Sequence, residues 1–290
     1  AGTSSTVGDC NIAIGVSSMI AVTTGIENIA IGSTSMGTLT QGTRNIGIGD
    51  RALNGGTTTG TSNIAIGVTS MNAVTSGECN VGIGVSALAA STTGCLNIAI
   101  GQTAMGGAVV TGIDNIAIGN EAGHPLTTGI CNIAIGRSAL SSSTTGCFNI
   151  AIGQTAMGGA VTTGKCNIAI GLTAMDALTS GNRNVAIGQD ALGASTTGIQ
   201  NVAIGYLALG AADTSGVDNI AIGYIAMDAL TTGICNVAMG TGALGASTTG
   251  CNNVAIGLTA MGGAVTIGLN NVAIGTTSMD ALTSGANNIA

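Results

Sequence analysis

The feature that most constrains this chain is a five-residue motif, Asn-Ile-Ala-Ile-Gly, which returns with small substitutions along the whole sequence. The numbers of its asparagines rise by 17, 17 and then 18, and these three steps repeat, so that every third asparagine is 52 further along. A strict repeat this short is typical of a solenoid, in which each coil is stable only on its neighbours. The motif asparagines are Asn11, Asn28, Asn45, Asn63, Asn80, Asn97, Asn115, Asn132, Asn149, Asn167, Asn184, Asn201, Asn219, Asn236, Asn253, Asn271 and Asn288.

The coil that begins at Asn167 illustrates the expected local structure. Ile168 and Ile170 alternate with Ala169, which is the pattern of a short strand with one buried face. The small third motif position, which is Ala in most coils, predicts a flat face able to lie against another chain. Met175 and Leu178 supply a second apolar pair, and Thr-Thr-Gly or Thr-Ser-Gly closes most coils as a turn whose glycine is free to take positive φ.

Stacking of these coils at about 4.8 Å, the spacing of hydrogen-bonded strands, predicts an all-β fold: a parallel β-solenoid or β-roll in which every third coil is longer by one residue. We expect one continuous array over residues 1–290, because the repeat runs without interruption. The chain starts without methionine and stops inside a motif, so we expect a processed chain or a window on a longer array. The asparagine column is expected to form an amide ladder that also satisfies backbone groups of the turns.

The composition excludes several classes of protein. Fifty glycines, one proline and three aromatic residues do not build an ordinary globular core, and 45% apolar residues in register argue against disorder. Only 6% of residues are charged and the net charge is −7, which argues against nucleic-acid binding. No apolar run approaches the ~20 residues of a membrane-spanning helix.

The sequence shows no constellation that predicts catalysis, a cofactor or a metal site. Asp176, Asp228 and Asp280 recur only every third coil, roughly 14 Å apart on the strand spacing, which is too far for paired carboxylates. The segment around His124 and Pro125 departs from the repeat, and we expect a locally irregular turn there rather than a binding site. A single histidine is weak evidence for a metal.

The cysteines all lie in the two positions just before a motif asparagine, a column shared with eight of the seventeen charged residues. This column is therefore expected to be a solvent-exposed edge, and the alternative of small buried thiols fits it poorly. In three pairs the cysteines lie on neighbouring coils with an offset of one position, near the favoured disulfide distance. We predict that these pairs form disulfides and that the two remaining cysteines either link chains or stay free. The predicted pairs are Cys79–Cys95, Cys131–Cys147 and Cys235–Cys251, and the remaining residues are Cys10 and Cys166.

The motif Asn-(Ile/Val)-Ala-Ile-Gly, followed by Ala-Leu or Ala-Met and closed by Thr-Thr-Gly, resembles the head repeats of trimeric autotransporter adhesins of the YadA type. It resembles still more the related repeats of phage tail fibres and bacterial surface fibres. The resemblance covers every coil and implies a left-handed parallel coil, often trimeric, with an adhesive or spacer role. The coil of the autotransporter heads is shorter than the coil of this chain.

Three classes of function are weighed from these observations. We expect a structural, non-enzymatic module of an extracellular fibre or filament, since oxidised cysteines imply an extracellular, cell-surface or virion-surface location. Its partners would be copies of itself, as a homotrimer or an end-to-end filament. The main alternative is an adhesin or phage tail-fibre module that binds a cell surface or a glycan. Tyr206 and Tyr224, which share a column in successive coils, are expected to stack, and we interpret this stack as packing rather than sugar binding. Ice binding by threonine ladders is less favoured, because serine interrupts them.

Overall fold

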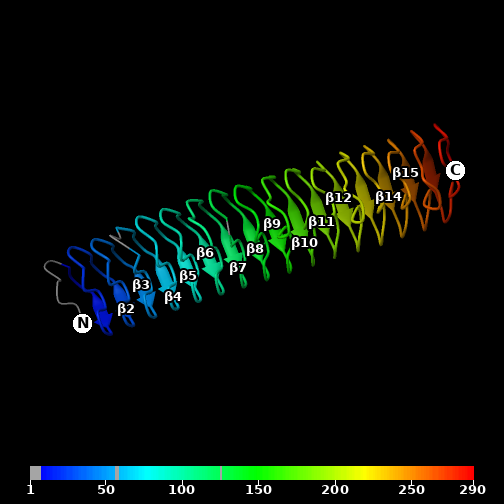
Figure 1. Cartoon of the computed structure of the whole chain (residues 1–290). Helices are drawn as coiled ribbons and strands as arrows, with labels where there is room; N and C mark the ends of the chain where they lie inside the picture. The colour runs from blue at the N-terminus through cyan, green and yellow to red at the C-terminus, as the bar shows by residue number, and fades with distance from the viewer. Residues whose placement is uncertain (1–7, 56–58, 125) are drawn as a thin grey trace. The chain divides into compact units, whose positions relative to one another are not determined.

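The computed structural model describes residues 8–55, 59–124 and 126–290 and contains sixteen three-residue strands joined by turns (Figure 1). Each strand is the Ile-Ala-Ile part of one motif, or a variant of it. The strands are β1 (Ile12–Ile14), β2 (Ile29–Ile31), β3 (Ile46–Ile48), β4 (Ile64–Ile66), β5 (Val81–Ile83), β6 (Ile98–Ile100), β7 (Ile116–Ile118), β8 (Ile133–Ile135), β9 (Ile150–Ile152), β10 (Ile168–Ile170), β11 (Val185–Ile187), β12 (Val202–Ile204), β13 (Ile220–Ile222), β14 (Val237–Met239), β15 (Val254–Ile256) and β16 (Val272–Ile274).

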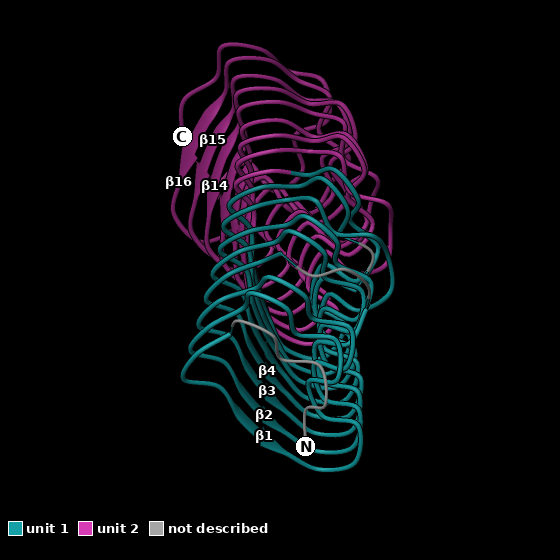
Figure 2. Cartoon of the chain, turned by 90° about the vertical axis from the view of Figure 1, so that its left-hand side faces the viewer, with its two compact units in different colours: residues 1–146 teal, residues 147–290 magenta. Residues whose placement is uncertain are grey.

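The chain divides into two compact units, residues 1–146 and 147–290, which are coloured separately in Figure 2. In the first unit β1 to β8 pair in chain order, and every pair is parallel. In the second unit β9 to β16 pair in the same way. Each motif residue lies beside its counterpart on the next coil, as Ala186 does beside Ala203. The prediction of an all-β parallel solenoid is therefore confirmed, and each unit is described by itself.

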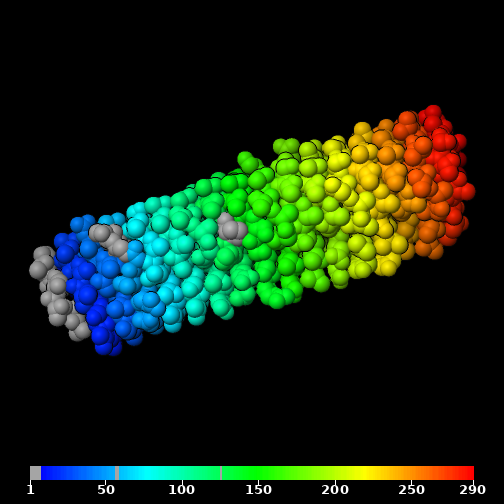
Figure 3. Space-filling view, viewed as in Figure 1, coloured from blue at the N-terminus to red at the C-terminus, as the bar shows by residue number. Residues whose placement is uncertain are grey.

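The extra residue of each longer coil leaves the strand register unchanged. A longer coil separates β15 from β16, yet Val254 still pairs with Val272 and Ile256 with Ile274. The additional residue is absorbed by the loop between the buried methionine and the closing turn, where the sequence reads Met261-Gly-Gly. Neighbouring coils are in close contact on the face shown in Figure 3.

The strands bury alanine and expose isoleucine, which corrects the facing expected from the sequence. Ala169, Ala186 and Ala221 are fully buried, whereas Ile187 and Ile220 keep 37% and 38% of their surface exposed. The small third motif position therefore faces the core, not a partner chain. The core of each coil also holds long apolar side chains, such as Met175 and Leu178 in one coil and Leu192 in the next.

Two coils in which glycine replaces the inward alanine show how tight this core is. Ser35 Oγ donates a 2.8 Å hydrogen bond to Gly47 O, and Ser70 Oγ does the same to Gly82 O. A Cβ placed on Gly47 would lie 2.9 Å from Ser35 Oγ, so alanine would collide with the serine hydroxyl. In a third coil with serine in this column the next strand keeps its alanine, and the hydrogen bond from Ser18 Oγ to Ala30 O is longer, at 3.3 Å.

In most coils three non-glycine residues adopt positive φ: the residue before the motif asparagine and the second and fourth residues after the motif glycine. In one coil these are Cys166, Thr173 and Met175, with φ of 60°, 54° and 52°. This conformation costs an L-residue about 1–2 kcal/mol. Stacking holds it in place, because Thr173 N donates to Gln154 O on one neighbouring coil and Met175 N donates to Ala191 O on the other.

The closing-turn glycine has a role different from the one predicted. Positive φ belongs to the motif glycine, for example 141° at Gly171, and not to Gly181 of the Thr-Ser-Gly turn. A Cβ on Gly181 would lie 2.3 Å from Gly198 O of the next coil. The turn therefore needs glycine because two backbones approach closely, and not because of its φ angle.

The observation that alanine faces the core and isoleucine faces outward leads to a testable prediction. We expect Ala221→Val to destabilise the protein by about 1–3 kcal/mol, because the buried site has no room for two more methyl groups. Ile220→Thr on the outward face of the same strand is expected to cost less than about 1 kcal/mol, since most surface substitutions stay near ±0.5 kcal/mol. Urea denaturation of both variants checks this. If the two costs are reversed, isoleucine is the core residue and the assigned facing is wrong.

Candidate functional site

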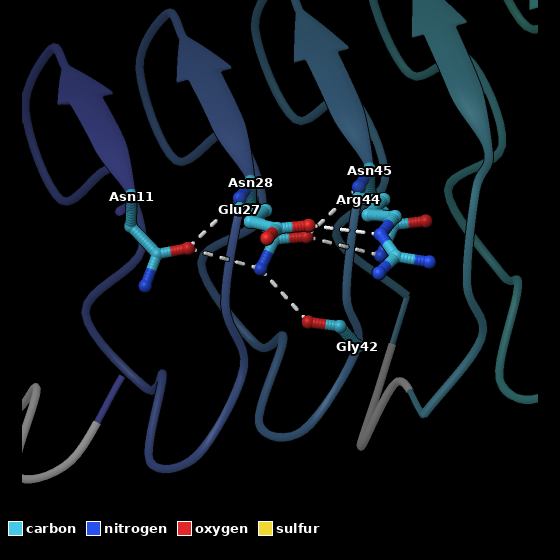
Figure 4. Close-up of polar contacts among 6 residues, drawn as sticks. All are labelled: Asn11, Glu27, Asn28, Gly42, Arg44 and Asn45. Carbon is cyan, nitrogen blue, oxygen red and sulfur yellow. Dashed lines mark hydrogen bonds and ion pairs between the residues drawn. The ribbon is translucent and has the colours of Figure 1, made fainter. Parts of the chain in front are cut away.

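The most extensive arrangement of polar side chains inside the protein is a ladder of buried asparagines. Asn28 is fully buried, and both its backbone N and its Nδ2 donate to Asn11 Oδ1, at 2.9 and 3.1 Å (Figure 4). Asn28 Nδ2 also donates to Gly42 O at 2.8 Å, and Asn28 Oδ1 accepts from the backbone N and Nδ2 of Asn45. Each side chain thus binds the coil before it and the coil after it.

The same set of bonds recurs in the second unit. Asn236 Nδ2 donates to Asn219 Oδ1 at 3.0 Å and to Gly250 O at 2.7 Å, while Asn236 Oδ1 accepts two bonds from Asn253. Buried polar groups are costly unless they are bonded, and here the amide partners belong to the coils before and after, while Gly250 closes the same coil. The ladder therefore makes the stability of one coil depend on the presence of the next.

Removal of one rung should have a large effect. In Asn236→Ala, the backbone N of Asn253 and the carbonyl of Gly250 lose their partners inside the protein, at about 1–3 kcal/mol for each buried group. We expect a loss of roughly 2–5 kcal/mol on that basis. Urea denaturation measures it, with Thr249→Ala in the exposed turn of the same coil as the matched control. A loss no larger than that of the control would show that the ladder contributes little.

The cysteine column lies on the surface of the coils, as its charged neighbours do. Cys79 and Cys235 are exposed, and Cys95 and Cys251 are partly exposed thiols. Leu96 N donates to Glu78 O at 3.0 Å, and Cys95 Sγ lies 3.4 Å from Glu78 N. The thiol of Cys95 thus points to the backbone beside Cys79, which is compatible with the pairing predicted from the sequence, and that pairing stays a prediction.

Two other cysteines have neighbours that the sequence analysis did not single out. Cys166 N donates to Cys147 O at 3.1 Å, so these residues are adjacent within the second unit. Cys131, the partner predicted for Cys147, belongs to the first unit. Cys166 also lines a shallow pocket of about 290 Å³ together with Lys165, Asn182, Arg183 and Ile199. The signal for this pocket was in the sequence as two cations on consecutive coils.

Charged side chains of the column also form ion pairs along the stack. Arg44 Nε lies 2.8 Å from Glu27 Oε2 of the preceding coil (Figure 4). These side chains keep 70% and 48% of their surface exposed, so the pair adds at most about 1 kcal/mol. The column is an exposed edge on which charge and thiol groups of neighbouring coils come together.

The three aspartates that recur every third coil are half-buried against the loops of the longer coils. A Cβ on Gly159 would collide with the carboxylate of Asp176, and one on Gly263 with that of Asp280. The Oδ1 atoms of Asp176, Asp228 and Asp280 are buried and have no hydrogen-bond partner among the described residues. Burial raises the pKa of Asp176, the backbone amide of Gly159 lowers it, and the carboxylate of Asp190 raises it. Burial also raises the pKa of Asp228.

The raised pKa values determine the direction of a pH effect. The folded state binds protons to Asp176 and Asp228 more tightly than the unfolded state, so stability should rise as the pH falls from 7 through the raised pKa values. The double variant Asp176→Asn/Asp228→Asn should melt at a higher temperature than the wild type at pH 7. That difference should shrink as the pH falls and vanish only near pH 3 and below, well under the ordinary aspartate pKa of about 3.9, where the carboxyls are protonated in both states. Asn72 occupies the same column in the first unit, so an amide fits.

Thermal melts from pH 3 to pH 8 test this, with Glu78→Gln on the exposed edge as the control. A double variant that is less stable than the wild type at pH 7 would show that the carboxylates have a bonding role.

The irregular coil at residues 120–124 keeps the pattern of its neighbours. Gly123 has φ of 58° and donates from its N to Ala139 O at 2.9 Å, so it replaces methionine in the buried column without breaking the stack. The ring of His124 lies over Gly107, in the column that holds Asp176 further along. Pro125 lies outside the described residues. This segment is a variation of the coil.

The rings of Tyr206 and Tyr224 stack, as predicted, with centroids 5.3 Å apart. Both side chains stay about half exposed on neighbouring coils of the second unit.

No group of three or more His, Cys, Asp or Glu side chains is placed to hold a metal ion in residues 8–55, 59–124 and 126–290. The same described segments include no helix long and apolar enough to span a bilayer.

Comparisons with protein families, with characterised proteins and with solved structures find no match to this chain. The resemblance to YadA-type heads and fibre repeats therefore depends on the repeat motif alone.

Proposed function

We propose that this chain is a structural, non-enzymatic module of an extracellular fibre. The asparagine ladder is the observation that supports this most, because its bonds join each coil to the next along the stack. Asn11 to Asn45 in the first unit and Asn219 to Asn253 in the second show the same pattern. Because the buried polar groups hold the coils together, the chain is suited to act as a stiff, extended module of a fibre.

The partner we propose is a second copy of the same chain, docked on the outward strand face. That face consists of the first and last residues of each strand and is aliphatic in all sixteen strands, without a charged residue. Ile170, Ile187 and Met239 keep 36%, 37% and 41% of their surface exposed. A second copy carries side chains at the same spacing, so the ridges of one face can match the grooves of the other.

The size of the face suggests how firmly copies would associate. Eight strands at about 4.8 Å and two side-chain columns give roughly 400 Å² per unit. A standard interface buries about 800 Å² per partner. One unit alone therefore offers about half of the area of a standard interface.

Disulfide staples and an extracellular location belong to the same proposal. The bonds Cys79–Cys95, Cys131–Cys147 and Cys235–Cys251 would each tie one coil to the next. The positions of Glu78, Cys95 and Leu96 support the first pair, since they bring the Cys95 thiol beside the backbone of the preceding coil. Persistent disulfides require an oxidising compartment outside the cytosol.

Assembly of the purified chain tests the proposed function. We expect the wild type to form multi-chain particles or filaments, and Ile170→Thr/Ile187→Thr/Ile222→Thr to shift it toward monomer, because the threonine hydroxyls weaken the apolar face. Val265→Thr/Ile267→Thr is the matched control, since these exposed aliphatic residues lie in the loop and the turn. Analytical ultracentrifugation and electron microscopy give the readout. A monomeric wild type at high concentration, or equal effects of both variants, would contradict the proposal.

Adhesion to a glycan remains the second candidate, and the exposed tyrosine stack favours it. Stacked rings such as Tyr206 and Tyr224 offer an aromatic surface of the kind on which a sugar ring can lie. Glycan-array binding that is lost in Tyr224→Ala would favour this alternative.

A further inference from the structure

Cys10 and Cys166, the two cysteines left without a partner in the predicted pairing, are both exposed thiols in the same column of the coil. Each is the residue before a motif asparagine, with φ of 59° and 60°. Their backbones and their positions in the coil are therefore alike. They differ in the charges that surround them.

The surroundings of Cys166 are positive. Lys165 precedes it, and Arg183 occupies the same column on the next coil, where its backbone N donates to Lys165 O at 3.0 Å. Asn182 Oδ1 accepts a 2.8 Å hydrogen bond from Lys165 N, and these residues line the shallow pocket around the thiol. Two of the five cations of a chain with net charge −7 are thus found beside one cysteine.

The surroundings of Cys10 are negative, opposite in charge to those of Cys166. Asp9 precedes it, and Glu27 occupies the same column on the next coil, where its backbone N donates to Asp9 O at 3.1 Å. Arg44, one coil further, pairs with Glu27 and removes part of the negative charge. The site around Cys10 is therefore net negative and the site around Cys166 is positive, so the two sites of different copies attract each other.

We propose that Cys10 of one copy and Cys166 of another form an intermolecular disulfide, guided by Asp9 and Glu27 on one side and Lys165 and Arg183 on the other. This deepens the proposed function, on which it depends, by naming one contact between copies. Because the contact joins two different patches of the chain, one bond leaves a free cysteine on each copy. These cysteines either bond each other and close a symmetric pair, or each bonds a further copy and extends the assembly. Like-charge contacts disfavour Cys10–Cys10 and Cys166–Cys166 links.

The bond requires an oxidant, and a small disulfide RSSR supplies it. The Cys166 thiolate attacks one sulfur of RSSR, an S–S bond forms to the protein, and RS⁻ leaves. The Cys10 thiolate of the second copy then attacks Cys166 Sγ, and the second RS⁻ leaves. The two protein thiols lose two electrons and two protons, and RSSR is reduced to two RSH.

Charge reversal tests the proposal on the full chain, with oxidised and reduced glutathione as the redox buffer. We expect Lys165→Glu/Arg183→Glu to slow the Cys10–Cys166 crosslink by about tenfold at low salt, the lower end of electrostatic steering. Asp9→Lys/Glu27→Lys should do the same. A chain that carries both charge reversals should crosslink at the wild-type rate again. Variants that had merely lost their fold would not recover in this way. A several-fold increase in salt concentration should slow the wild type by shortening the screening length.

Non-reducing electrophoresis and mass-spectrometric mapping of crosslinked peptides identify the bonds, with Cys10→Ser and Cys166→Ser as controls. A map that pairs Cys166 with Cys147, with another Cys166, or with Cys10 of the same chain would overturn the proposal. So would a rate that charge reversal leaves unchanged.

The outcome is separable from that of the proposed function. Suppose that Ile170→Thr/Ile187→Thr/Ile222→Thr assembles as the wild type does and that the Cys10–Cys166 bond still forms between chains. The outward strand face is then not the docking surface, while the proposed disulfide contact is supported. If the chain assembles under the same buffer and the bond is missing from the map, this contact fails and the fibre proposal stands.

Discussion

The structure depends on the hydrogen bonds of a buried amide column. Each motif asparagine inside the stack is removed from water, and its donors and acceptor are satisfied only when a coil lies on both sides of it, as for Asn28 between Asn11 and Asn45. An isolated coil would leave these groups buried and unbonded, or exposed with the core open. The ladder therefore explains why the sequence repeats so strictly and why the strands can be as short as three residues.

The stacking of coils also makes an otherwise costly backbone possible, through backbone hydrogen bonds between coils. Three non-glycine residues in most coils, such as Cys166, Thr173 and Met175, have positive φ. Over a few coils their cost would reach the size of the stability of a small domain. Their amides bond to the coil on either side, so the stack selects the conformation that no isolated coil would keep. The strained backbone conformation therefore persists only because the coils stack.

The period, the short strands and the parallel solenoid could be predicted from the sequence, because spacing alone determines them. The facing of the strands could not be predicted from hydrophobicity, because both faces are apolar and isoleucine is the more hydrophobic residue. The useful signal was size: Ala169 and its counterparts are always alanine or glycine, which fits a confined position in the core. The positive φ angles could not be predicted, because they belong to residues such as Met175 that rarely adopt them.

The same facing is central to the functional account, because it turns sixteen pairs of aliphatic side chains outward. The most direct measurement is a cryo-EM reconstruction of the native assembly prepared without reductant. The account predicts neighbouring chains in contact through the outward strand face, with the side chains of residues such as Ile170 and Ile187 buried between copies. Assemblies in which these columns face solvent, while another face makes the contacts, would contradict it.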